Sequence, residues 1–259
     1  MSHPTNADRS SQPIPDSGIG EVLVSSRSLD EYRAMFALSE SDLQLSILDC
    51  PGGASSATAE INAAGGRAVA ADPVYGSGLD AAQLAAMAQA ETDRGNAYIR
   101  AHPEQYRWSF FDDADDHRRS RTAAGHRFGR DYAEHPGRYI PGRLPDLPVA
   151  TGAFDLVLSS HLLFSYADRL SAGFHLQAIA ELVRVARREV RIFPLVAMGS
   201  VRYRLADLIA GLLATGVKGH VVDVDYEFQI GGSQMLVCRP VEGVESHGED
   251  LRFRNLPES

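Results

Sequence analysis

The segment ILDCPGGASSATAEINAAGGRAVAAD, residues 47–72, is the stretch of this chain that decides its fold. It has the pattern of a buried β-strand, a tight glycine turn, a helix, and a second strand that ends in a carboxylate, Asp72. Glycines let a ligand approach the backbone of such a turn, and the following helix N-terminus presents free N–H groups. An acid about twenty residues further on accepts hydrogen bonds from ribose hydroxyls. The segment therefore predicts a nucleotide-binding α/β sheet.

The turn, residues 50–55 (CPGGAS), differs from the turns that bind dinucleotides. It lacks the G-x-G-x-x-G pattern, and an acid, Asp49, comes directly before it. A carboxylate at this place disfavours a phosphate group and favours a cationic or neutral ligand. An NAD-dependent oxidoreductase is therefore the less favoured alternative.

A hydrophobic strand, an acid and a glycine turn in this order resemble motif I of the class I S-adenosylmethionine-dependent methyltransferases. Pro51, Gly53 and Ser55 stand at the three glycine positions of that motif. The run FDLVLSSHLLF, residues 154–164, is similar to the fourth strand of the same family, whose C-terminal end faces the transferred methyl group. The resemblance covers residues 29–240 apart from an insertion, and it implies a divergent member of this superfamily.

The fold class implied by the resemblance is α/β, with a Rossmann-like seven-stranded methyltransferase sheet, mostly parallel with an antiparallel last strand, plus a helical insertion. Hydrophobic patterns predict helices at 28–38, 55–64, 80–99, 171–186 and 205–215. They predict strands at 46–50, 68–72, 138–140, 154–164, 189–195, 220–228 and 234–239. Ser28 and Glu31 have the spacing of a capping box at the start of the first helix.

The predicted domain organisation is a single methyltransferase domain between two tails. Residues 1–27 form a disordered N-terminal tail, residues 28–240 form the domain, and residues 241–259 form a C-terminal tail. An insertion at about 76–137 is expected to form a helical lid over the C-terminal edge of the sheet. Within it, residues 102–138 have no clear period.

The resemblance also implies which residues bind the cofactor, S-adenosyl-L-methionine. They are expected to be Asp49, Pro51, Gly52, Gly53, Ser55, Asp72, Pro73, Ser159 and Ser160. Asp49 and Asp72 have an alternative role as caps or turn formers, which is common for Asp. Family members carry an acid after the third strand that contacts adenine, and Gly142 and Arg143 stand there instead.

His161 is the candidate catalytic residue, because it follows a buried strand at the edge where ligands of open α/β sheets bind. A histidine there can act as a general base for a hydroxyl, thiol or amine. The alternative is a hydrogen-bonded histidine of the core.

Arginines and aromatic residues alternate in the insertion, and Arg107, Trp108 and Arg121 are the candidate substrate contacts. Such a mixture clamps an acidic small molecule, binds RNA bases, or forms salt bridges with neighbouring acids. The acidic run at 112–117 (DDADDH) offers possible metal ligands, although Asp runs more often form loops and caps. No metal is expected.

Composition excludes several other classes of protein. The 259 residues are 44% hydrophobic, which suffices for one large core. The net charge of -9 makes nucleic acid an unlikely partner, and no apolar run reaches the length of about eighteen residues that a membrane span needs. Cys50 and Cys238 form neither a disulfide scaffold nor a zinc set. The expected protein is a cytoplasmic methyltransferase acting on a small molecule, with a non-catalytic binding protein of the same fold as the alternative.

Overall fold

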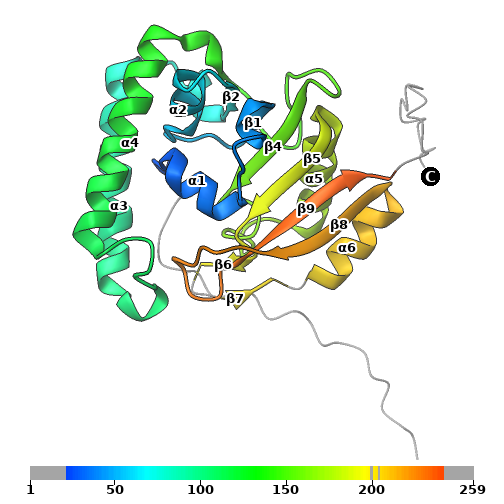
Figure 1. Ribbon diagram of the computed structural model, residues 1–259. Coiled ribbons are helices and arrows are strands. Elements are labelled where there is room, and N and C mark those ends of the chain that lie inside the picture. Colours follow the sequence, from blue (N-terminus) through cyan, green and yellow to red (C-terminus); the bar gives the residue numbers. More distant parts are fainter. Residues whose placement is uncertain (1–21, 199–200, 204, 242–259) are drawn as a thin grey trace, which may run out of the picture.

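The computed structural model describes residues 22–198, 201–203 and 205–241, which form one central sheet with helices on both faces (Figure 1). The strand order is β3-β2-β1-β4-β5-β9-β8. The strands are β1 (Ser46–Asp49), β2 (Arg67–Ala71), β3 (Tyr139–Ile140), β4 (Phe154–Ser160), β5 (Ala186–Phe193), β8 (Val217–Asp223) and β9 (Gln234–Pro240).

Strand directions confirm the predicted fold class. The pairs β2–β3, β1–β2, β1–β4 and β4–β5 are parallel, whereas β9 is antiparallel to both β5 and β8. The last strand in the chain is thus the one that runs against the others, as expected for the class I methyltransferase sheet. β9 is inserted between β5 and β8. A dinucleotide-binding sheet of order 3-2-1-4-5-6 is all parallel and has no inserted antiparallel strand.

Alternating side chains of the strands supply a separate core on each face of the sheet. Ile47 of β1 packs toward α1 (Leu29–Phe36) and α2 (Ala57–Ala63), while its neighbour Leu48 packs toward α5 (Ala172–Val185) and α6 (Leu205–Ala214). Both residues are fully buried. Successive strand residues point to opposite faces, so a sheet covered on both sides requires this continuous apolar run.

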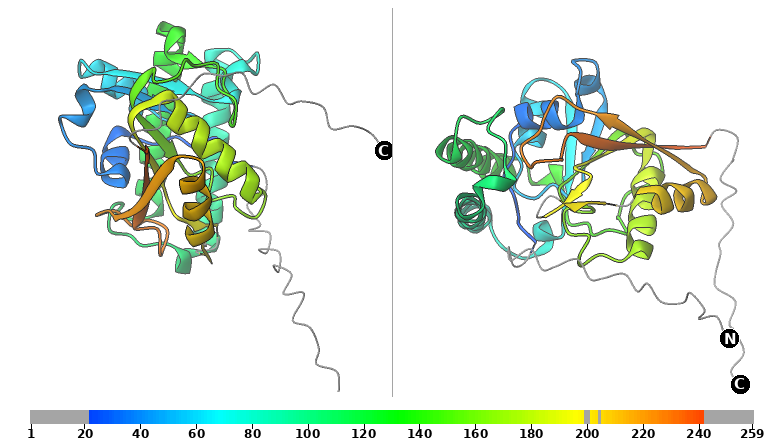
Figure 2. Two further views of the ribbon diagram at one scale, coloured as in Figure 1. Left: turned by 90° about the vertical axis from the view of Figure 1, so that its right-hand side faces the viewer. Right: turned by 90° about the horizontal axis from the view of Figure 1, so that it is seen from below.

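The insertion between β2 and β3 is a pair of long helices, α3 (Ala81–Ala101) and α4 (Ala114–Glu134). Figure 2 shows them side by side at one edge of the molecule. The first was predicted within two residues of its bounds, but the second lies where no period was recognised. Its buried stripe begins with His117 and Arg121 and continues with Ala124 and Phe128. Helical spacing is present, but charged and polar side chains occupy part of the buried face.

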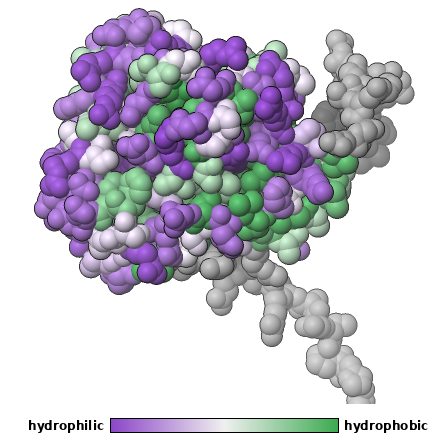
Figure 3. Space-filling model, in the orientation of Figure 1, coloured by the Kyte–Doolittle hydropathy of each residue, from purple (hydrophilic) through white to green (hydrophobic). Residues whose placement is uncertain are grey.

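The outer surface of the helix pair is hydrophilic, as the purple left side of Figure 3 shows. Its inner surface meets the sheet edge through Phe128 of α4, which is 1% exposed and packs with Tyr75 and Tyr139. The pair therefore covers the edge of the sheet near the ends of β2 and β3.

The N-terminal boundary differs from the prediction. Residues 22–28, here called the strap, cross the glycine turn instead of belonging to a disordered tail, and Ser26 is fully buried. Backbone N–H groups of Ala54 and Ser56 donate to the carbonyls of Ser25 and Arg27 at 3.1 and 2.9 Å. The remainder of the predicted tails, residues 1–21 and 242–259, lies outside the described residues.

Several element ends also differ. β4 stops at Ser160 rather than at residue 164, because His161 adopts a left-handed backbone with φ 49° that no strand continues. A short hairpin, β6 (Val196–Ala197) with β7 (Val201–Arg202), was not predicted. Single turns of 3-10 helix are η1 (Asp42–Gln44), η2 (Pro73–Gly76), η3 (Pro103–Gln105) and η4 (Pro136–Arg138).

Two further sequence expectations concern cysteines and membranes. Cys50 and Cys238 are both buried and carry free thiols. Among the described residues, no helix has the length and apolar character that crossing a membrane requires.

Candidate functional site

The glycine turn after β1 needs both of its glycines. A Cβ on Gly52 would lie 2.6 Å from the Tyr75 hydroxyl and 2.7 Å from the Ala70 Cβ. Gly53 has φ 53°, a conformation that costs other residues energy, and the Ser25 carbonyl of the strap lies 3.1 Å from its ideal Cβ position. The turn is therefore packed tightly between β2 and the strap.

A cavity of ≈ 240 Å³ lies beside this turn, and we call it the turn cavity. It brings together predicted cofactor residues from three separate segments with residues of the strap. The predicted residues in its wall are Pro51, Gly52, Gly53, Asp72, Pro73, Ser160 and His161. The cavity thus lies at the C-terminal ends of β1, β2 and β4, the edge where ligands of open α/β sheets bind.

Asp72 holds the turn and also faces the cavity. Its two carboxylate oxygens accept the backbone N–H groups of Gly53 and Val74, each at 2.9 Å. Both the cap role and the ligand role therefore fit, because each oxygen keeps a further lone pair for a ligand hydroxyl. Burial raises the pKa of Asp72, although the two backbone N–H groups oppose that effect.

Asp49 does not line the turn cavity. Both of its oxygens lie 3.0 Å from the hydroxyl of Tyr32, and Tyr32 itself forms part of the cavity wall. Burial raises the pKa of Asp49 to about 8, so the group is mostly protonated at neutral pH. Asp49 thus contacts the wall of the turn cavity through Tyr32, and the expectation that its charge disfavours a phosphate stays a prediction.

The three predicted serines have different positions. Ser55 is buried behind the turn, where its hydroxyl donates to the Arg27 carbonyl at 3.0 Å and accepts the Ala57 N–H at 3.1 Å. Ser159 is 1% exposed and does not line the turn cavity. Ser160 lines the turn cavity, and its hydroxyl lies 2.8 Å from the Nδ1 of His161.

A second cavity, of ≈ 100 Å³, lies between the strap, the helix pair and the segment after β4, and we call it the helix cavity. The two cavities share part of their walls, which is formed by His161, Arg27, Ser25 and Leu23. Backbone N–H of His161 donates to the Phe193 carbonyl at 2.8 Å, which fixes the residue in the shared wall.

The environment of His161 disfavours a positive charge. Burial lowers its pKa well below the usual value, and the guanidinium groups of Arg27 and Arg121 lower it further. The imidazole is therefore neutral at physiological pH. A group with so low a pKa is a weak base, but it can still donate or accept a hydrogen bond.

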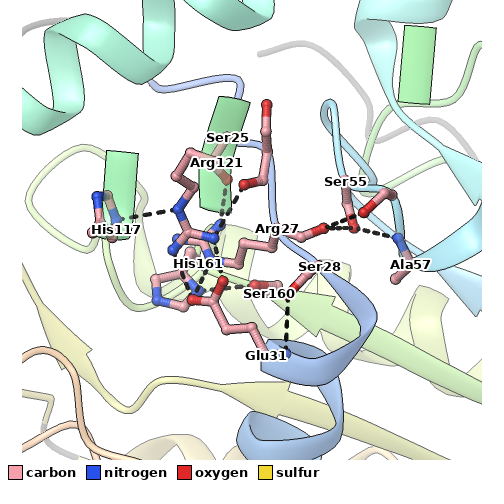
Figure 4. A network of polar contacts seen from close by, with 12 residues as sticks. Ser25, Arg27, Ser28, Glu31, Ser55, Ala57, His117, Arg121, Ser160 and His161 are labelled. Carbon is pink, nitrogen blue, oxygen red and sulfur yellow. Dashed lines mark hydrogen bonds and ion pairs between the residues drawn. The ribbon is translucent and has the colours of Figure 1, made fainter. Parts of the chain in front are cut away.

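A buried ion network connects α4 to α1 beside the helix cavity (Figure 4). Arg121 forms two hydrogen bonds with the Glu31 carboxylate, which is fully buried and also accepts the Tyr226 hydroxyl at 2.7 Å. Arg27 lies 3.5 Å from the same carboxylate. Burial alone would raise the pKa of Glu31, but Arg121 and Arg27 lower it below the usual value.

This network corrects two sequence expectations. Ser28 caps α1 by accepting the N–H of Glu31 at 3.3 Å, but the Glu31 side chain binds Arg121 instead of completing a capping box. Arg121 lines the helix cavity as expected of a substrate contact, but its guanidinium already binds Glu31, the Ser26 carbonyl and the Nε2 of His117.

Arg107 and Trp108 are not brought to either cavity. The Arg107 side chain is 56% exposed and pairs with Glu227 at 2.6 Å. Trp108 packs edge-on against Phe228 with ring centroids 5.4 Å apart. Both residues belong to the connection between α3 and α4, which lies against the loop before β9.

The acidic run at 112–117 starts α4 rather than forming a ligand cluster. The Asp113 side chain caps the helix by accepting the N–H of Asp116 at 2.7 Å, and Asp115 pairs with Arg100. In the described part of the chain, no three His, Cys, Asp or Glu side chains are gathered as metal ligands.

Sequence reasoning missed Arg27 and His117 as residues of the site. Arg27 belongs to the strap, which carries no periodic pattern, so only its packing across the turn reveals it. His117 was recognised only as part of the acidic run. The signal that could have placed it is the helical spacing of His117, Arg121 and Phe128, all buried on one side of α4.

Comparisons with known proteins add little about activity. No family model matches the chain. An uncharacterized protein of Methanocaldococcus jannaschii is 28% identical over 220 residues, which cover 85% of this chain and 96% of that protein.

Solved structures give only distant likenesses. Mitomycin 7-O-methyltransferase is 13% identical with a TM-score of 0.46, covering 82% of this chain and 54% of its own. The present chain thus spans about half the length of that enzyme. Magnesium protoporphyrin IX methyltransferase from Synechocystis, solved with bound S-adenosylhomocysteine, is 12% identical with a TM-score of 0.43, covering 81% of this chain and 80% of its own. The fold assignment therefore rests on the strand order itself.

Proposed function

We propose that this chain transfers a methyl group from S-adenosylmethionine to a small molecule. The observation that carries the proposal is that the two cavities share a wall that contains the polar side chains of His161 and Arg27. A methyl donor in the turn cavity and an acceptor in the helix cavity would face each other there. Alignment of donor and acceptor is the main contribution that a protein makes to such a transfer.

The residues of the turn cavity fit the proposed cofactor. Asp72 keeps a lone pair on each oxygen for the two ribose hydroxyls, and Gly52 and Gly53 allow close approach of the ligand to the backbone. S-adenosylmethionine supplies an activated methyl group, which bonds to a lone pair of the acceptor as the carbon–sulfur bond breaks and leaves its electrons on sulfur.

His161 is proposed to orient the acceptor rather than to remove its proton. Its lowered pKa makes it a poor base near pH 7, whereas the Ser160 hydroxyl at 2.8 Å holds the ring in one orientation. A neutral imidazole in the shared wall can then direct a lone pair of the acceptor toward the methyl group. This modifies the expectation of a general base.

Two alternatives have specific consequences. An NAD-dependent oxidoreductase is disfavoured because the inserted antiparallel β9 departs from the dinucleotide-binding sheet, and because Pro51 offers no N–H to a pyrophosphate. A non-catalytic protein of this fold would bind S-adenosylhomocysteine without transferring a methyl group from the parent cofactor.

Calorimetry with S-adenosylhomocysteine, S-adenosylmethionine and NAD tests the proposal. We expect binding of both adenosyl ligands and none of NAD. Asp72→Ala should weaken the binding of S-adenosylhomocysteine by about 1.5 to 3 kcal/mol, or roughly ten- to hundred-fold in affinity. The reason is the loss of a buried carboxylate that accepts hydrogen bonds from the two ribose hydroxyls. His161→Asn should leave that affinity within about threefold, since Asn tolerates a left-handed backbone. The absence of binding at millimolar ligand would refute the cofactor assignment.

The Asp72→Ala protein needs a check of its folded state, because Asp72 also holds the turn through Gly53 and Val74. Thermal unfolding without ligand separates the two roles. If affinity is unchanged although the protein is folded, the ribose role of Asp72 is wrong while the cofactor assignment stands.

A further inference from the structure

The helix cavity gathers buried polar atoms that lack a hydrogen bond within the described part of the chain. These atoms are the Nε of Arg27, the Nδ1 of His117, and the hydroxyl oxygens of Ser26 and Ser165. A buried polar atom without a partner costs ~1–3 kcal/mol, and such atoms are rare in folded proteins. Four of them around one cavity indicate a ligand that completes their hydrogen bonds.

His117 must present a donor to this ligand. Its Nε2 lies 3.2 Å from the Nε of Arg121, and a guanidinium group can only donate. Burial and the neighbouring Arg121 lower the pKa of His117 to about 2, so its ring is neutral. The single ring proton is therefore on Nδ1. Together with the Nε–H of Arg27, it requires acceptor atoms on the ligand.

Among the residues that the structure describes, the charges beside the cavity leave one positive charge unbalanced. Arg27 and Arg121 share one carboxylate, that of Glu31. The other acid in the cavity wall, Glu91, is paired with Arg94 at 2.6 Å. An unbalanced charge removed from water attracts an ion of opposite sign, because burial weakens its solvation. The acceptor atoms of the ligand are thus best supplied by an anionic group.

The remaining wall is apolar and limits the size of the ligand. It includes Tyr106 and Phe228, whose rings lie 4.9 Å apart, and Ile99. The ring of His117 stacks on Phe228 at 5.0 Å with an interplanar angle of 11°. The cavity volume of ≈ 100 Å³ is below the roughly 150 Å³ of an engineered apolar cavity that binds benzene. The apolar body of the ligand is therefore smaller than one aromatic ring unless the wall moves.

We propose that the methyl acceptor is a small organic acid, whose anionic group binds Arg27 and the Nδ1–H of His117 while its apolar body, smaller than one aromatic ring, lies against Phe228. This inference rests on the proposed methyltransferase function. The Ser26 and Ser165 hydroxyls complete the hydrogen bonds of the anionic group. Arg27 also lines the turn cavity, so an acid bound to it lies next to the site of the methyl donor.

Isobutyrate and isobutyramide are matched probes, because they share a body smaller than one ring and differ in charge. Calorimetric titration of the protein, with and without saturating S-adenosylhomocysteine, should show isobutyrate binding at least tenfold more tightly. His117→Gln should abolish this preference, since Gln keeps an acceptor near the position of Nε2 for Arg121 but has no donor at the position of Nδ1. His126→Gln is the matched control, because His126 is exposed on the same helix.

Two serine variants test the site without risk to the fold. Ser165→Ala and Ser159→Ala each remove a buried hydroxyl that has no partner, so both proteins should be as stable as the wild type or more stable. Only Ser165→Ala should weaken the binding of isobutyrate, by threefold or more, because Ser159 lies outside the cavity.

Different outcomes separate the two proposals. Equal affinity for the two probes, or a preference that survives in His117→Gln, overturns the organic-acid assignment. An equal loss of isobutyrate affinity in Ser165→Ala and Ser159→Ala overturns it as well. If the charge preference is found but S-adenosylhomocysteine does not bind, the anion site stands and the methyltransferase function fails.

Discussion

Burial determines the ionisation of Asp49, which lies behind the glycine turn. Its pKa is raised to about 8, from an ordinary value near 4, because the carboxyl group is removed from water. As the pH rises from about 4 to 8, the unfolded chain loses this proton while the folded protein keeps it. The folded state binds more protons over this range, so the contribution of Asp49 to stability falls as the pH rises.

Asp49→Asn should remove this pH dependence, because an amide has the shape of the protonated acid and does not titrate. Urea unfolding at pH 5 and pH 8 measures the effect. Between these values the wild type should lose on the order of 2 to 4 kcal/mol more stability than the variant. Asp80→Asn, at the exposed N-cap of α3, is the control, since Asn caps a helix as well as Asp does. Parallel pH profiles of the wild type and Asp49→Asn would contradict a raised pKa.

At the scale of elements, small residues allow α3 and α4 to pack closely. A Cβ on Gly129 of α4 would lie 2.9 Å from the Cβ of Ala85 on α3, a separation that folded proteins do not show. By contrast, a Cβ on Gly95 of α3 would meet the strap residue Leu23 at an ordinary 3.6 Å. Close packing of the helix pair therefore requires a glycine at position 129 but not at position 95.

Gly129→Ala should destabilise the protein by about 1 kcal/mol or more, because the overpacking of two rigid backbones exceeds the gain in helix propensity. Gly95→Ala, the matched control, should be neutral or stabilising by up to about 1 kcal/mol. Thermal or urea unfolding of both variants provides the comparison. A stabilised Gly129→Ala protein would mean that the helix pair separates easily, as a mobile lid would.

At the scale of the whole molecule, the strap connects the two cavities with the helix pair. Its carbonyls accept N–H groups of the glycine turn at Ala54 and Ser56, and Arg121 of α4 donates to the Ser26 carbonyl at 3.1 Å. A ligand that fixes the turn should therefore also restrain the strap and the first half of α4.

Hydrogen exchange tests this connection. In the free protein, the segment 98–132 should exchange faster than the central strands, and saturating S-adenosylhomocysteine should slow exchange in residues 22–28 and in the first half of α4. Helix α5 on the opposite face is the internal control and should not change. Protection limited to the glycine turn would show that the helix pair is an independent, rigid cover.

Much of the candidate site was predictable from local sequence. Gly52, Gly53 and Asp72 follow buried strands, and a parallel sheet necessarily brings the C-terminal ends of its strands to one edge. His161 was placed there for the same reason. The ionisation of Asp49 was not predictable, because a pKa depends on burial and on neighbours that come from elsewhere in the chain.

The sequence by itself determined which segments form the strands and where the turn that starts the site lies, because hydrophobic period and glycine position act over short distances. Only the tertiary structure decided which residues form the helix cavity. Arg27 and His117 are 90 residues apart, and they meet because a strap and a helix with a partly polar buried stripe pack against one another. No local pattern encodes such a contact, since a buried charge is stable only beside partners that folding supplies.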